Sequence, residues 1–149
     1  MSEYKAPVTD IAFVLEEHVG MAEIAALPGL EEATPDLVRA ILEGAAQLTE
    51  AAIAPLNRSG DQQGSRVENR AVVQAEGFKE AYWQYVDGGW NAIAGSPDHG
   101  GQGLPFSLAC CVLETLAAAN MGFSLLPMLT VGAIEALTHH GGEEQKALY

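Results

Sequence analysis

The chain has 149 residues and an acidic charge balance, with 7 Lys plus Arg against 20 Asp plus Glu and a formal net charge of −13. This charge repels a phosphate backbone, which excludes nucleic acid as a partner. A content of 48% hydrophobic and 18% charged residues is typical of a globular protein and excludes a disordered acidic tail. We therefore expect a single folded domain over residues 1–149.

Residues 1–33 are predicted to form an N-terminal extension. The opening residues show no secretory signal, and no apolar run reaches the roughly 20 residues of a membrane span, so we expect a cytoplasmic protein without a span. Thr9 is suited to cap a first helix, in which Ile11 and Leu15 share one face. Gly20 is expected to end that helix.

The clearest helix start in the sequence is Thr34-Pro35-Asp36, which combines a capping side chain, a proline at the first position and an acid next. Apolar residues then recur at intervals of three and four from Leu37 to Leu56, which predicts one continuous helix face down to a break at Pro55 and Asn57. We interpret this segment as a packing helix, and residues 34–149 as a helical bundle.

Residues 57–73 show no sustained periodicity and contain Gly60 and Gly64, so we predict a loop that is either functional or a docking surface. Three of the seven cations lie here, namely Arg58, Arg66 and Arg70. They indicate either an anion site or arginines that are solvated or paired with acids, and we favour the second interpretation.

Helical spacing resumes near Ala75 and stops at Gly88-Gly89, where glycine accepts a positive φ. Pro105 opens the next helix, and a third segment from Phe123 to His140 ends at Gly141-Gly142. No strand pattern is evident. Five or six helices with short connections predict an all-α fold, a helical bundle.

The cysteines and histidines favour structural roles. Cys110 and Cys111 are adjacent on a predicted helix, where their side chains diverge, so we expect buried thiols and no mutual disulfide. His139 and His140 precede a helix end, where cations complement the dipole, and we interpret them as capping residues rather than metal ligands.

Glu114 and Glu135 are isolated acids in apolar helices, and such acids are candidates for a general base when they are buried. We favour a polar stripe, or pairing with a nearby hydroxyl or cation. No catalytic residue, cofactor-binding residue or metal ligand is predicted within the chain.

A glycine-dense loop lies between Gly88 and Pro105, and its segment from Asp98 to Gly103 invites comparison with phosphate-binding loops. No strand precedes it and no Gly-Lys-Ser/Thr follows, so we interpret it as scaffold. Three further segments are distinctive alongside this loop, namely Tyr4-Lys5-Ala6-Pro7, Gly77 to Tyr82 and His140 to Lys146. Together these segments resemble the N-terminal domain of acyl-CoA dehydrogenases, in particular the long-form members of that family.

The resemblance implies a flavoenzyme that dehydrogenates an acyl-CoA thioester between its α and β carbons. In that family a glutamate removes the α proton and the β hydrogen leaves as hydride to FAD, which an electron-transfer acceptor then reoxidises. A homo-oligomer is also implied. The chain is shorter than a complete enzyme and stops at Tyr149, inside an expected helix. We therefore expect a truncation before the flavin-binding β domain, and a fragment that neither holds FAD nor turns over substrate alone.

The resemblance also directs attention to the segment from Phe123 to Ala133, which corresponds to the helix that walls the acyl pocket. Its residues Leu125, Met128, Leu129 and Gly132 lie at intervals of three and four and share a face. We predict that they contact the acyl chain, through apolar burial worth about 0.8 kcal/mol per CH₂. The alternative is that the same stripe is bundle core.

A rival hypothesis assumes the same helical fold but no enzymatic activity. In it, the chain is a non-catalytic acidic helical binding module or subunit. A finished module of this kind would be monodisperse and would melt cooperatively, whereas a domain with missing neighbours would expose an apolar face and associate.

Overall fold

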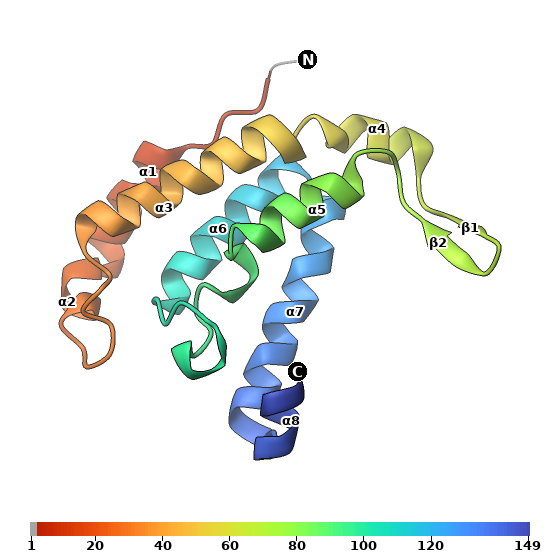
Figure 1. The fold of residues 1–149 in the computed structure, drawn as a ribbon. Coiled ribbons are helices and arrows are strands. Elements are labelled where there is room, and N and C mark those ends of the chain that lie inside the picture. The colour runs from red at the N-terminus through yellow and green to blue at the C-terminus, as the bar shows by residue number, and fades with distance from the viewer. Residues whose placement is uncertain (1–2) are drawn as a thin grey trace.

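A computed structural model describes residues 3–149, which form a predominantly helical fold with one small sheet (Figure 1). This confirms the predicted fold class, apart from the sheet. The helices and strands, in chain order, are α1 (Val8–Val14), α2 (Met21–Ala25), α3 (Pro35–Leu48), α4 (Leu56–Gln63), β1 (Arg66–Glu68), β2 (Ala71–Val73), α5 (Phe78–Asp87), α6 (Phe106–Ala119), α7 (Met121–His140) and α8 (Glu143–Leu148).

The predicted start of α3 is confirmed. The Thr34 hydroxyl oxygen accepts a hydrogen bond from the N–H of Leu37 at 3.3 Å, and Pro35 occupies the first turn. Helix α3 continues directly into a π-helical turn at Thr49–Ile53, and the predicted break at Pro55 is confirmed, because α4 begins only at Leu56. Pro55 has no N–H to continue the helical ladder, which accounts for the break.

The first core lies between α1, α3 and α6. The N-terminal extension takes part in it, because α1 and the π-helical turn that follows bury Ile11, Ala12 and Leu15. Helix α1 begins at Val8 with Pro7 before it, so the predicted Thr9 cap was wrong. Gly20 ends this segment at φ +74°, as predicted. The main partners from the rest of the chain are Val38, Leu42, Ala45, Leu108 and Val112.

The second core lies where α5, the end of α6, the start of α7 and the π-helical turn meet. Phe123 is fully buried at its centre, with its ring centroid 5.9 Å from that of Phe78 and 6.5 Å from that of Tyr85. The remaining buried members are Ile53, Ala81, Leu116 and Ala119. This core fixes the point from which α7 departs.

The predicted loop at 57–73 is the largest correction. It contains α4 and an antiparallel hairpin in which Val67 of β1 pairs with Val72 of β2. Strands of three residues are too short to produce a visible alternation, so the sequence pattern missed them. Helix α4 was missed because Asn57, Ser59 and Gly60 interrupt its apolar spacing.

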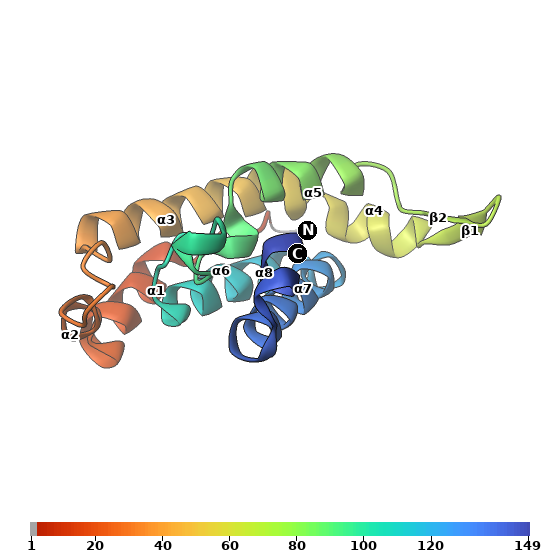
Figure 2. The same cartoon turned by 60° about the horizontal axis from the view of Figure 1, so that its bottom comes forward.

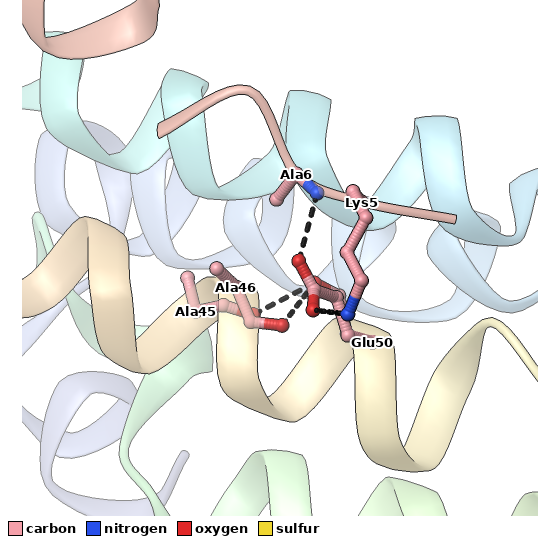
Figure 3. A network of polar contacts seen from close by, with 6 residues as sticks. Lys5, Ala6, Ala45, Ala46 and Glu50 are labelled. Carbon is pink, nitrogen blue, oxygen red and sulfur yellow. Dashed lines mark hydrogen bonds and ion pairs between the residues drawn. The ribbon is translucent and has the colours of Figure 1, made fainter. Parts of the chain in front are cut away.

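The N-terminal segment is held against the π-helical turn that follows α3 by one carboxylate (Figure 3). Glu50 accepts hydrogen bonds from the Lys5 ammonium at 2.8 Å and from the N–H of Ala6 at 2.9 Å. Just before these residues, the Tyr4 hydroxyl donates to the carbonyl of Thr115 in α6 at 3.1 Å. These contacts join the opening residues to the π-helical turn after α3 and to α6.

Helix α7 is long and largely exposed. Its 20 residues include a stretch with a mean hydropathy of 1.4, of which 17% is buried. Among residues 3–149 it is the one helix whose length and composition would suffice to cross a membrane. The expectation that no apolar segment is as long as a membrane span is therefore corrected for α7. Length and composition alone do not distinguish a membrane span from a helix that packs on protein.

Candidate functional site

The candidate site lies on α7, and its position begins with the cap of that helix. The Asn120 side chain is buried, and its Oδ1 accepts from the N–H of Phe123 at 3.1 Å. Its Nδ2 donates to the carbonyl of Ile53 at 3.4 Å. One side chain thus starts α7 and joins it to the π-helical turn after α3. Sequence reasoning missed this residue, although Asn is a favoured helix cap.

The four predicted acyl-contacting residues are exposed on one side of α7. Leu125 is 50% exposed, Met128 43% and Leu129 73%, and Gly132 is exposed as well. The alternative was that this stripe forms part of the bundle core. Within residues 3–149 these side chains are not buried in a core, so that alternative is wrong for this part of the protein. The buried positions of α7 are Phe123, Ser124 and Pro127, all in its first two turns.

Neighbouring residues extend this stripe. A helix has about 3.6 residues per turn, so positions three, four, seven and eleven residues away fall on the same side. Met121 and Ala136 meet this spacing and are also exposed. We call the exposed apolar set the α7 face: Met121, Leu125, Met128, Leu129, Gly132 and Ala136. A continuous exposed apolar surface of this kind is typical of a binding or docking site.

Two grooves lie beside α7, and one of them includes residues of the α7 face. A groove of about 490 Å³ lies between α4 and α7, and Leu125, Leu126 and Leu129 contribute its apolar wall. A second groove of about 860 Å³ runs between β2 and α5, where it also contacts Leu126. Phe78 lines both grooves. The structure therefore places two predicted residues, Leu125 and Leu129, along a groove, whereas Met128 and Gly132 line neither.

A third, smaller cavity of about 50 Å³ lies between α5, α6 and α7. Its walls are mainly apolar and include Trp90, Phe106 and Ile134. The exposed Cys110 and Glu135 also line it. The volume is much smaller than that of the small-molecule sites found in proteins, which typically enclose about 300–1,000 Å³.

The glycine-dense loop is closed on itself. The N–H of Gly101 donates to the carbonyl of Ser96 and that of Gly103 to Gly95, both at 2.9 Å. The Gln102 amide then donates to the carbonyl of Gly89 at 2.8 Å. Backbone groups that would contact a phosphate are thus used within the loop, which supports its interpretation as scaffold.

The titratable side chains of residues 3–149 form no arrangement typical of a catalytic site. Burial, with help from Glu114 and Cys110, raises the pKa of the Cys111 thiol to about 11. Burial likewise raises the pKa of Tyr85 to about 12, and its hydroxyl donates to the carbonyl of Trp90 at 3.0 Å. The expectation of two buried thiols was wrong for Cys110, because its position on α6 turns it away from both cores.

The polar residues at the end of α7 pair with each other. Glu135 Oε2 lies 3.3 Å from His139 Nε2, one helical turn away, on the exposed side of α7, which agrees with the favoured interpretation of this acid as part of a polar stripe or a pair. His139 and His140 lie in the last turn of α7, which Gly141 ends, as the interpretation of a helix-end position requires. Within residues 3–149 neither side chain donates a hydrogen bond to a carbonyl of that turn, so the donor part of the interpretation is not met. The same described residues contain no cluster of ligands that could hold a metal ion.

Comparison with known proteins identifies the class to which this fold belongs. Residues 35–149 match the family described as acyl-CoA dehydrogenase, N-terminal domain. The chain belongs to this family. Over 146 residues it is 42% identical to the 3-methylmercaptopropionyl-CoA dehydrogenase of Ruegeria pomeroyi, which covers 98% of this chain. It spans about a quarter, 25%, of that relative's length.

Proposed function

We propose that the protein to which this chain belongs is an FAD-dependent acyl-CoA dehydrogenase, and that the α7 face forms one wall of its acyl pocket. The observation that carries the proposal is the exposure of the α7 face in a domain of this family. The proposed reaction removes hydrogen from the α and β carbons of an acyl-CoA thioester. The substrate in the relative's name, 3-methylmercaptopropionyl-CoA, is the first compound to test.

Apolar burial is the physical basis of the proposed role. An acyl chain gains about 0.8 kcal/mol for each CH₂ removed from water, and the α7 face gives it apolar surface to cover. The absent side chain at Gly132 leaves space beside Met128 and Leu129, since no atom lies within 4 Å of a Cβ built there. Met128 is flexible enough to adapt to different occupants.

The residues described do not fit a flavin site on their own. The glycine loop is closed, and the N–H groups of Gly101 and Gly103 already donate to carbonyls within it. The chain also has only seven Lys plus Arg for the phosphates of FAD or coenzyme A. We therefore assign FAD, the glutamate base and the contact with the electron acceptor to the part of the enzyme that this chain does not span. Residues 3–149 would bury and orient the acyl chain.

The test uses the full-length enzyme and residues 1–149 in parallel. The full-length protein is expected to retain bound flavin, seen in its visible absorption spectrum, and to reduce an artificial electron acceptor when an acyl-CoA is added. Residues 1–149 alone should do neither. Turnover by the short chain, or a flavin-free and inactive full-length protein, would contradict the proposal.

A further inference from the structure

The β1–β2 hairpin extends away from α4 and α5 (Figures 1 and 2). Val67 and Val72 are direct cross-strand partners, and they are 73% and 64% exposed. A two-stranded hairpin with so little to pack against is marginally stable in water. An additional contact would therefore stabilise this one.

The turn of the hairpin is tightly defined. Asn69 and Arg70 both have positive φ, at 50° and 65°, which is the conformation of a two-residue type I′ turn. This turn matches the twist of the two strands and fixes their register, in which Glu68 lies opposite Ala71. The hairpin thus presents a defined edge.

Strand β1 has one edge that is unpaired within residues 3–149, since the sheet contains β1 and β2 alone. Its sequence is Arg66-Val67-Glu68. No β1 residue lines either groove, whereas Val72 and Val73 of β2 line the groove beside α5. The free edge of β1 is consequently the outer edge of the hairpin.

This edge is complementary to a second copy of itself. If two β1 strands pair antiparallel about a two-fold axis at Val67, then Val67 lies opposite Val67 of the second copy. Arg66 then lies opposite Glu68 of the second copy, and the reverse pair forms on the other side. Within one chain Arg66 Nε already lies 2.5 Å from Glu68 Oε1, so both charges occupy the same side of β1. Opposite charges placed directly across strands stabilise a sheet.

We propose that β1 pairs edge to edge with β1 of a second copy of the protein, which joins two hairpins into a four-stranded sheet with the order β2-β1-β1-β2. The contact is isologous, as expected for a two-fold axis. Pairing between three-residue strands buries little area, so it orients copies that also meet elsewhere. Strand β2 is less suited, because its Ala71-Val72-Val73 sequence contains no charge to select a register.

A disulfide crosslink in the full-length enzyme tests the pairing, after Cys110 and Cys111 are replaced by serine. Across the proposed axis, the Cα atoms of residue 67 lie within the span that a disulfide bridges. The Val67→Cys variant should form a linked dimer on oxidation. The matched control is Val72→Cys, which is similarly exposed but lies two strand spacings farther from its copy. Equal crosslinking of both variants, or none at residue 67, would overturn the proposal.

Charge reversal provides an independent readout, in the Val67→Cys protein. Arg66→Glu alone or Glu68→Arg alone places like charges opposite each other twice, and should lower the crosslinking yield roughly tenfold. Co-expression of the two variants restores opposite pairs and should restore the link between unlike chains. Arg58→Glu on α4 makes the same charge change away from β1 and should leave the yield unchanged. Pairing of β1 with another segment of the chain would give no recovery on co-expression, which overturns the proposal.

Discussion

The backbone of Gly95 lies directly against Gly101, so that a Cβ built on Gly101 would come within 2.1 Å of the carbonyl carbon of Gly95. The two residues close the loop between α5 and α6, and the N–H of Gly103 donates to Gly95 in the same place. The neighbour is backbone and cannot rotate away. Glycine at position 101 is therefore required by close approach.

Gly101→Ala is expected to destabilise the fold by about 3 kcal/mol, because the methyl group forces two backbone segments apart. The measurement is the midpoint of urea unfolding. Gly122→Ala serves as the control, since a Cβ there makes an ordinary contact, 3.6 Å from Asn120 Oδ1. A Gly101→Ala variant as stable as the control would show that the loop is not closed in this way.

Asn120→Ala should lower the free energy of unfolding by about 2 kcal/mol. The substitution removes the cap of α7, worth about 1 kcal/mol, and leaves the carbonyl of Ile53 without its buried donor. Asn57→Ala, at an exposed position in α4, is the matched control and should change stability little. Equal effects of the two variants on the urea midpoint would contradict the dual role of Asn120.

The Glu50 carboxylate makes attachment of the N-terminal segment dependent on pH. The hydrogen bond from Lys5, with that from the N–H of Ala6, lowers the pKa of Glu50 below the ordinary value of 4.5. A lowered pKa in the folded state stabilises attachment fully above pH 4.5, and this stabilisation is lost as the pH falls through the lower value. We expect hydrogen exchange at Ala6, measured relative to the intrinsic rate of the unfolded chain at each pH, to accelerate over that range.

Two variants test whether protonation of Glu50, and not a general effect of acid on the fold, controls exchange at Ala6. Glu50→Gln should speed exchange at Ala6 already at neutral pH and remove its acid dependence. Glu43→Gln, at an exposed position in α3, should preserve both the slow exchange and its pH profile. Acid-dependent exchange that persists in Glu50→Gln would assign the effect to another group.

The two cysteines are expected to react at different rates with a maleimide. Cys110 is exposed, whereas Cys111 is partly buried and its pKa is raised to about 11. Since the thiolate is the nucleophile, labelling of Cys111 should be slow at pH 8 and should accelerate about tenfold per pH unit up to its pKa. Cys110→Ser should remove the fast phase. Persistence of that phase in the variant would contradict the assignment.

The sequence was sufficient to predict elements that begin or end with a strong local signal. Thr34-Pro35 begins α3 and Gly20 ends the segment after α1, as predicted, because capping chemistry and positive φ are properties of a few adjacent residues. The family resemblance, carried by short motifs, was also confirmed.

Elements that depend on tertiary contact were missed. Helix α4 packs Gly60 against the ring of Phe78, where a Cβ would come within 2.6 Å, and local periodicity does not record that contact. The β1–β2 hairpin depends on a turn at Asn69 and Arg70, where positive φ at an arginine gives no sequence signal. For α7 the spacing identified a face but not its exposure, because core and exposed stripes share one periodicity.

The most direct test of the account is the dependence of kcat/KM on acyl chain length in the full-length enzyme, for the unmodified protein and for Gly132→Leu. A leucine would fill the space beside Met128, so activity should fall most for the longest acyl chains, by roughly fourfold for each CH₂ that is excluded. Thr138→Leu, exposed on another side of α7, should leave the profile unchanged. An unaltered profile in Gly132→Leu would contradict the assignment of the α7 face to the acyl pocket.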